Sequence, residues 1–299
     1  MSETKSTDQG RVAIVTGAGK SLGAAYAHAL GARGLKLVVN NRCREGESPS
    51  ADKVVAELRA KGVDAVAEYS DIAEPGAAQA IVQKAIDHFG RLDVVVFNAG
   101  IVGDAGWFGK FDIDSFRSVM EINYFANVAI ALAALPHLKK SGSGRCIFVS
   151  SAAGQYGARG LAPYAGTKGA LTSFALTLSD ELKRYGVGVN VLTPFAVTQM
   201  TANDFGDDGA YAKPEHTAPA VAWMASADNP MTGQVWVAAG GHYRRAMSVE
   251  TLGGNGENTP EWLSENADAM SSLDDLKTFP GAQEAFYDIF SEVISKKNK

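Results

Sequence analysis

The sequence has little cysteine, no excess of positive charge and no long uninterrupted hydrophobic run. Its 299 residues include two cysteines, Cys43 and Cys146, which lie far apart without a Cys-x-x-Cys or Cys/His cluster, so neither a disulfide framework nor a zinc site is indicated. The five histidines form no ligand spacing, and we predict no metal. Lysine and arginine number 28 against 33 aspartates and glutamates, which argues against nucleic-acid binding.

No apolar run approaches the roughly 18 residues that cross a bilayer. The first ten residues are polar and lack the apolar core of a signal peptide. We therefore expect a cytoplasmic protein without membrane contact, with residues 1–10 as a flexible tail. Apolar residues make up 46% and charged residues 20%, which is typical of a globular protein with one large core.

From residue 11 to about 241, short apolar runs alternate with longer stretches of helical spacing. The runs are continuously apolar, as in parallel strands covered on both faces: R-V-A-I-V-T, L-K-L-V-V-N-N, A-V-A-E-Y-S, L-D-V-V-V-F-N, R-C-I-F-V-S-S, G-V-N-V-L-T-P and Q-V-W-V-A-A. The helical segments are 21–33, 50–61, 75–89, 113–139, 162–185 and 215–226. We predict an α/β fold: a Rossmann-type doubly wound parallel sheet of about seven strands, in three α/β/α layers.

Two segments interrupt this alternation. Residues 195–214 are rich in Gly, Asp, Thr and Ala and follow the sixth run, so they are expected to form a substrate lid over the carboxyl ends of the strands, or else a plain surface insertion. Residues 242–299 form a C-terminal extension that packs on the domain 11–241 or on a partner subunit, either as an oligomer contact or as a solvated cap.

A glycine-rich turn, T-G-A-G-K-S-L-G, follows the first run. Glycines let the backbone turn tightly and approach a pyrophosphate at the N-terminus of the next helix, although such turns also occur in plain strand–helix connections. The spacing differs from G-x-G-x-x-G, because three residues separate Gly19 from Gly23. Ser21 stands where a small residue is required.

Tyr164 and Lys168 lie four residues apart, so a helix places them on one face. A nearby ammonium lowers the pKa of a phenol from its ordinary value of about 10 toward neutrality, which suits proton transfer. The alternative is a half-buried tyrosine packed over a lysine stem. Ser151 lies thirteen residues before Tyr164 at the end of an apolar run, and Asn123 lies in the middle of a helical segment.

These residues, with Thr16-Gly17 and Asn98-Ala99-Gly100, resemble the short-chain dehydrogenase/reductases in order and spacing. The resemblance covers residues 11–241 and extends to T-G-Q-V-W-V-A-A-G-G. It implies that Tyr164 is the general acid/base, that Lys168 lowers its pKa and bonds the nicotinamide ribose, and that Ser151 polarises the substrate carbonyl. Asn123 would hold a water that links Lys168 to solvent, unless its side chain satisfies backbone groups in a helix kink.

The same resemblance implies a dinucleotide site. Its residues would be Gly17, Gly19, Lys20, Ser21, Leu22, Gly23, Asn41, Arg42, Asp71, Ile72, Asn98, Ala99, Gly100, Tyr164, Lys168, Pro194, Val197 and Thr198. Asp71 would contact the adenine, or cap the next helix instead. Phe97 and Phe195 depart from the family, which has asparagine and glycine at these places.

The end of the second run indicates which cofactor is used. Asn41 stands where an acidic residue would bond a free ribose 2′-hydroxyl, so no carboxylate repels a phosphate there. Arg42 follows at once and Lys20 lies in the glycine-rich turn, where both could bind a 2′-phosphate or merely be surface charges. We predict NADP(H), with NAD(H) as the alternative.

The sequence also resembles, within the family, the (3R)-hydroxyacyl-CoA dehydrogenase module of multifunctional enzyme type 2 and the related 17β-hydroxysteroid dehydrogenases. S-P-S-A-D-K-V-V-A-E-L-R-A-K-G and residues 88–100 carry this likeness. We expect an oxidoreductase that moves a hydride between nicotinamide and a ketone or secondary alcohol, as a homodimer or homotetramer. The alternatives are an NAD-dependent hydroxyacyl-CoA or hydroxysteroid dehydrogenase, and a non-enzymatic dinucleotide sensor.

Overall fold

The structure is a computed structural model that describes residues 8–197, 212–257 and 259–297. The chain divides into two compact units, Met1–Arg245 and Ala246–Lys299. The first unit is built on a sheet in the order β3-β2-β1-β4-β5-β6-β7-β8. Its strands are β1 (Val12–Val15), β2 (Lys36–Asn40), β3 (Ala65–Glu68), β4 (Val94–Phe97), β5 (Arg145–Val149), β6 (Gly188–Phe195), β7 (Gln234–Ala239) and β8 (His242–Ala246).

The seven predicted strands are present, and every pairing from β3 through to β7 is parallel. β8 is an addition to the expected set. It follows β7 after Gly240 and Gly241, whose φ angles of 54° and 82° suit the two-residue turn of an antiparallel hairpin. Its sequence, H-Y-R-R-A, has no apolar run, and its residues are mostly exposed, so hydrophobic patterning did not indicate a strand there.

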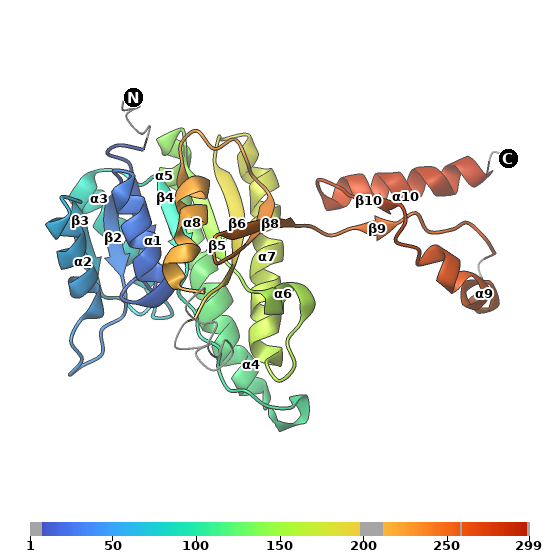
Figure 1. The fold of residues 1–299 in the computed structure, drawn as a ribbon, viewed down its shortest axis with the longest axis horizontal. Coiled ribbons are helices and arrows are strands. Elements are labelled where there is room, and N and C mark those ends of the chain that lie inside the picture. The colour runs from blue at the N-terminus through green and yellow to red at the C-terminus, as the bar shows by residue number, and fades with distance from the viewer. Residues whose placement is uncertain (1–7, 198–211, 258, 298–299) are drawn as a thin grey trace. The chain divides into compact units, whose positions relative to one another are not determined.

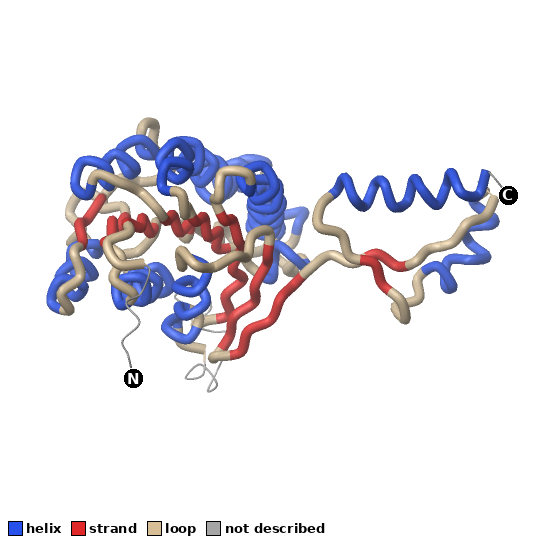
Figure 2. Tube along the Cα trace, turned by 90° about the horizontal axis from the view of Figure 1, so that it is seen from above, coloured by secondary structure: helices blue, strands red, loops and turns tan. Residues whose placement is uncertain are grey.

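Helices cover both faces of the sheet, which confirms the predicted three-layer α/β/α arrangement (Figure 1, Figure 2). One layer holds α1 (Ser21–Ala32), α2 (Ser50–Ala60) and α8 (Ala218–Ala225); the other holds α3 (Ala77–Phe89), α5 (Ala126–Ser141) and α7 (Ala162–Lys183). The short elements are η1 (Phe108–Lys110), α4 (Ile113–Met120), η2 (Glu121–Phe125), α6 (Ala152–Tyr156) and η4 (Pro214–His216). β1, β2, β4 and β5 are buried almost throughout, because helices exclude water from both of their faces.

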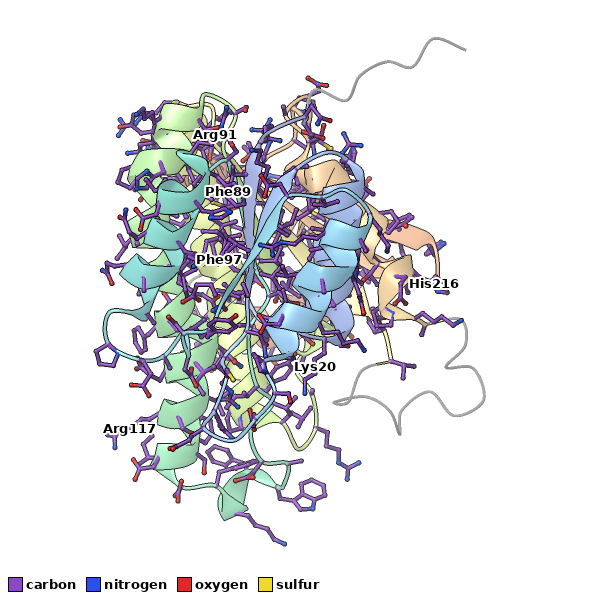
Figure 3. All side chains as sticks on the ribbon, turned by 90° about the vertical axis from the view of Figure 1, so that its left-hand side faces the viewer. Lys20, Phe89, Arg91, Phe97, Arg117 and His216 are labelled. Atoms are coloured by element: carbon purple, nitrogen blue, oxygen red, sulfur yellow. The ribbon has the colours of Figure 1, made fainter. Side chains whose placement is uncertain are left out.

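Phe97, which departs from the family pattern, closes β4 inside the sheet (Figure 3). Its ring stacks on that of Phe148 in β5, with centroids 4.1 Å apart, and Phe148 in turn meets Phe174 of α7 edge to face. The aromatic side chain therefore fills the space between the sheet and α7 without disturbing the turn that follows it.

The expected helix 113–139 is divided into three pieces. α4, the π-helical turn η2 and α5 run continuously from Ile113 to Ser141, and one helical turn in the middle is widened by a residue. This stretch is long and apolar enough to cross a membrane, and 39% of its most apolar window is buried within the structure. In this fold α5 packs on α3 and β4.

Asp8, expected from the sequence to lie in a flexible tail, is fully buried. Its carboxylate accepts hydrogen bonds from Arg11 (2.8 Å), Arg33 (2.7 Å) and the backbone N–H of Ala227 (2.9 Å). Burial alone would raise the pKa of Asp8, but these hydrogen bonds outweigh it and leave the pKa below its ordinary value. Residues 8–10 therefore belong to the folded domain.

The second unit contains β9 (Glu250–Thr251), α9 (Pro260–Met270), β10 (Leu276–Lys277) and α10 (Ala282–Lys297). β9 and β10 pair antiparallel, and Thr259 caps α9 by accepting a hydrogen bond from Trp262 N–H. α10 carries exposed apolar side chains at helical spacing: Phe286, Ile289, Phe290 and Val293. Whether this unit packs on the domain or on a partner subunit stays a prediction.

Candidate active site

The ends of β1 and β4 are tied together by Thr16. Its hydroxyl accepts hydrogen bonds from the backbone N–H groups of Asn98 (3.0 Å) and Ala99 (3.1 Å). Asn98 Nδ2 returns a hydrogen bond to the Thr16 carbonyl at 2.9 Å. The glycine-rich turn and the Asn-Ala-Gly segment, 82 residues apart in sequence, thus form one structural unit at the carboxyl ends of neighbouring strands.

The turn has no room for side chains at its glycines. Gly17 has a positive φ of 65°, which disfavours other residues. A Cβ at Gly19 would lie 2.2 Å from Ser50 Oγ, and one at Gly23 would lie 2.3 Å from the Gly17 carbonyl oxygen. The spacing of three residues between Gly19 and Gly23 therefore still produces a close turn that opens into α1.

Ser21, the first residue of α1, fits a phosphate ligand. Its φ of 52° is the one positive value at a non-glycine residue in the described ranges, and its buried Oγ has no hydrogen-bond partner there. No side chain caps the start of α1 at Lys20 (Figure 3), so the first N–H groups of this helix need another acceptor. An anion such as a pyrophosphate satisfies both needs, and the predicted dinucleotide fits this turn.

The predicted contacts beyond β2 lie close to the turn. Asn41 Nδ2 donates a hydrogen bond to Ser50 Oγ at 2.8 Å, which places this side chain against Gly19. Arg42 forms an ion pair of 3.0 Å with Asp71, and both side chains are partly exposed. Asp71 also accepts a hydrogen bond from Ala73 N–H at 3.2 Å, so it shapes its own turn as well as holding Arg42.

Ser151 and Tyr164 form a hydrogen bond with each other. Ser151 ends the segment after β5 and caps α6 by accepting a hydrogen bond from Ala153 N–H at 3.2 Å, while Tyr164 stands in the first turn of α7. Burial raises the pKa of Tyr164, and its hydrogen bond with Ser151 opposes that rise. The two hydroxyls therefore form a pair from which one acceptor atom can receive two hydrogen bonds.

Lys168 lies one helical turn further along α7. Its ammonium is buried 5.8 Å from the centre of the Tyr164 ring and donates a hydrogen bond to the Val149 carbonyl at 2.8 Å. Burial lowers the pKa of Lys168 to about 8. The expected lowering of the Tyr164 pKa by Lys168 is not seen here, because burial of the phenol dominates and the ammonium bonds to Val149.

Asn123 lies in the π-helical turn and is fully buried. Its Nδ2 donates to the Ile101 carbonyl (2.8 Å) and to Thr167 Oγ1 (3.0 Å), and its Oδ1 accepts from Ile101 N–H (2.8 Å). These contacts correspond to the alternative in which the side chain satisfies backbone groups at a helix irregularity. A water relay through Asn123 stays a prediction.

Gly100 is the point where these elements converge. A Cβ there would lie 2.9 Å from Asn123 Oδ1 and 3.5 Å from Lys168 Nζ, so the Asn-Ala-Gly segment runs directly beside both side chains. The structure thus brings Asn98, Ala99 and Gly100 against the predicted catalytic residues on one side and against the glycine-rich turn on the other.

Several supporting residues were missed by sequence reasoning. Ser150 Oγ lies 3.0 Å from the Lys168 carbonyl and 2.8 Å from Thr172 Oγ1, which joins β5 to α7. Gly154 lets α6 touch α7, since a Cβ would lie 2.6 Å from the Lys168 carbonyl carbon. The serine pair at 150–151 and the glycine three residues after it were the available signals in the sequence.

The last predicted contacts follow β6. Pro194 lies within the strand, and Phe195, where the family has glycine, is 41% exposed at its end. Val197 N–H donates to the Ala212 carbonyl at 2.6 Å, which closes the base of the predicted lid 195–214. Ile72 is buried after Asp71. Thr198 and residues 199–211 lie outside the described residues, so the lid stays a prediction.

Known proteins resemble this chain in both fold and sequence. The family model described as short chain dehydrogenase matches residues 11–208. A short-chain type dehydrogenase/reductase of Mycobacterium tuberculosis is 35% identical over 84% of this chain and 90% of its own length. The peroxisomal multifunctional enzyme type 2 of Mus musculus is also 35% identical, over 86% of this chain but only 36% of the longer enzyme.

Solved structures agree with these relatives. A short chain dehydrogenase from Mycobacterium avium superimposes with a TM-score of 0.77 at 32% identity, covering 88% of this chain and 95% of that chain. The full-length peroxisomal multifunctional enzyme type 2 of Drosophila melanogaster gives a TM-score of 0.79 at 28% identity, covering 96% of this chain and 50% of that one. The chain therefore belongs to the short-chain dehydrogenase/reductases, a family of oxidoreductases that use nicotinamide nucleotides.

Proposed function

We propose that this protein is an NADP(H)-dependent oxidoreductase that interconverts a ketone and a secondary alcohol, with Tyr164 as general acid/base. The observation that carries the proposal is the hydroxyl pair of Ser151 and Tyr164 with the buried ammonium of Lys168 one helical turn away. When bound, the nicotinamide supplies or accepts the hydride. The glycine-rich turn and the Oγ of Ser21 would hold its pyrophosphate.

The chain's own residues account for the proton. In the reducing direction, the hydroxyls of Ser151 and Tyr164 donate hydrogen bonds to the carbonyl oxygen, and Tyr164 transfers its proton as negative charge develops there. The charge of Lys168 then favours the phenolate that is left. Burial raises the pKa of Tyr164, which disfavours the phenolate, so the reverse reaction depends more strongly on the charge of Lys168.

Tyr164→Phe tests this assignment, because it removes the hydroxyl and leaves the ring. We expect at least about a hundredfold loss of turnover, since general acid catalysis typically contributes that much, with little change in fold or cofactor affinity. Turnover is measured with a panel of ketones, and cofactor affinity by fluorescence titration. Lys168→Ala serves as the comparison and should reduce both turnover and cofactor affinity. A Tyr164→Phe enzyme that keeps more than about a tenth of the turnover contradicts the proposal.

The preference for NADP(H) rests on Asn41, Lys20 and Arg42. No carboxylate stands at Asn41 to bond a ribose 2′-hydroxyl; Lys20 lies in the glycine-rich turn and Arg42 follows Asn41 directly. One observation favours the alternative, an NAD-dependent hydroxyacyl-CoA or hydroxysteroid dehydrogenase: Arg42 is already paired with Asp71, so a 2′-phosphate has to compete with that carboxylate. The ratio of kcat/KM with the two cofactors decides between them.

A further inference from the structure

A cation stacked on an aromatic ring lies on the loops that connect the elements carrying the predicted catalytic residues. Arg159 belongs to the connection between α6, which Ser151 caps, and α7, which carries Tyr164. Its guanidinium carbon lies 4.5 Å from the centre of the Trp107 ring, in the segment between β4 and η1. Arg159 lies five positions before Tyr164, so their Cα atoms lie at most about 18 Å apart.

Backbone contacts hold this pair in place. Gly106 N–H, next to Trp107, donates to the carbonyl of Gly160, next to Arg159, at 2.9 Å. Leu161 N–H closes a turn on the Ala158 carbonyl at 3.1 Å. Because both loops are joined directly beside the stacked side chains, the guanidinium is positioned before any ligand arrives, which reduces the ordering cost of binding.

The charge of Arg159 is available to a ligand. The ring of Trp107 is the contact that its guanidinium makes among the described residues, where it forms no ion pair. The carboxylates that follow Trp107 in the sequence have other partners: Asp112 accepts from Ser115 at the start of α4, and Asp114 pairs with Arg117. The exposed Asp104 lies on the same loop as Trp107 and makes no ion pair there.

Exposed aromatic side chains border the two loops that hold the pair. Trp107 is 61% exposed, Phe108 at the start of η1 is 74% exposed, and Tyr156 at the end of α6 is 79% exposed. Exposed aromatic side chains near a cation suit a ligand that has both an apolar part and an anionic group. The rings cover the apolar part, and the guanidinium forms two parallel hydrogen bonds with the anionic group.

We propose that Arg159, held by Trp107, is a specificity-determining residue that binds an anionic group of the substrate, a phosphate or a carboxylate, on the arm that extends away from the reacting carbonyl. This proposal rests on the oxidoreductase function proposed above. Arg159 takes no part in hydride or proton transfer, so its effect falls on KM for anionic substrates and not on the chemical step.

The test uses two matched sets of substrates. For phosphate, acetoacetyl-CoA is compared with the neutral N-acetylcysteamine thioester of the same acyl group. For carboxylate, methyl ketones with a terminal carboxylate on chains of increasing length are compared with their methyl esters. The full-length protein is assayed with each substrate. The anion is identified by the set in which kcat/KM for the anionic substrate exceeds that for its neutral partner by the larger factor.

Arg159→Gln removes the charge and keeps a polar side chain. We expect KM for the preferred anionic substrate to rise about tenfold to a hundredfold, the size of a charge-assisted hydrogen bond, while the neutral partner changes less than about twofold. Arg159→Lys should recover part of the loss. Arg184→Gln is the matched control, because Arg184 stacks on Tyr185 at 4.8 Å at the opposite end of α7 and should leave both substrates unchanged.

Equal effects of Arg159→Gln on the anionic and neutral partners, or no effect on either, would overturn the proposal while leaving the oxidoreductase function intact. If the unmodified protein turns over no substrate of either set, the proposed function itself is contradicted. Calorimetric titration of coenzyme A and of the carboxylates then decides on Arg159 separately: weaker binding to Arg159→Gln than to Arg184→Gln supports it, and equal binding overturns it.

Discussion

At the scale of single residues, the site combines groups whose proximity depends on burial. Lys168 is fully enclosed, and its pKa falls to about 8, whereas an exposed lysine would stay near 10.4. The sequence showed the four-residue spacing to Tyr164 but not that the ammonium would bond the Val149 carbonyl. The direction of the Tyr164 pKa shift was wrong at sequence level, because desolvation of the phenol depends on the packing around it.

Arg42→Asp is the residue-scale prediction for cofactor choice. Loss of one charge-assisted contact to a 2′-phosphate should reduce NADP(H) affinity roughly tenfold to a hundredfold, and the new carboxylate should repel the phosphate and bond a free 2′-hydroxyl instead. The preference measured as kcat/KM should therefore reverse toward NAD(H).

Arg44→Asp is the control for this substitution. Arg44 is also exposed on the loop after β2, and its replacement by aspartate changes the net charge by the same amount. It should leave the preference unaltered. If the unmodified enzyme already has the higher kcat/KM with NAD(H), this interpretation of Lys20, Asn41 and Arg42 is wrong.

At the scale of elements, the site depends on the close approach of α6 to α7. Gly154→Ala places a methyl group 2.6 Å from the Lys168 carbonyl carbon, so α6 must move and carry Ser151 with it. We expect a loss of about 1–3 kcal/mol in the free energy of unfolding, typical of overpacking. Turnover should fall through the altered distance between Ser151 and Tyr164.

Gly166→Ala, within α7 itself, is the matched control. A Cβ at Gly166 meets nothing within 4 Å, and alanine favours a helix over glycine by about 0.5–1 kcal/mol. This variant should therefore be as stable as the unmodified protein or more so in urea unfolding. Equal stability of the two variants would show that α6 and α7 are not in obligatory contact.

At the scale of the whole molecule, buried charge clusters join the start of the chain to distant segments. Asp8 bonds Arg11, Arg33 and Ala227, and Asp93 accepts from Arg91 and Ser141. Although burial opposes it, hydrogen bonding holds the pKa of both carboxyls below the ordinary value. Their stabilisation is therefore present above the unfolded pKa of about 3.9 and is lost as pH falls toward the lower folded values.

Asp8→Asn should lower the free energy of unfolding at pH 7 by about 3–5 kcal/mol, because it leaves the buried Arg11 without its carboxylate. It should also flatten the decline in stability below pH 4. Urea unfolding at several pH values measures both effects. Asp114→Asn, in an exposed pair with Arg117, should cost less than about 1 kcal/mol, and a similar loss in both variants would contradict the role of Asp8.

The sequence by itself determined the parallel sheet, the order of its layers and the family. Those features follow from local patterns: continuous apolar runs, helical spacing, and motifs such as the four-residue spacing between Tyr164 and Lys168. Only the tertiary structure decided the eighth strand, the burial of Asp8, the engagement of Asn123 with Ile101 and the pair formed by Arg159 and Trp107. Each of these arises from contacts between segments distant in sequence, whose partners no local pattern specifies.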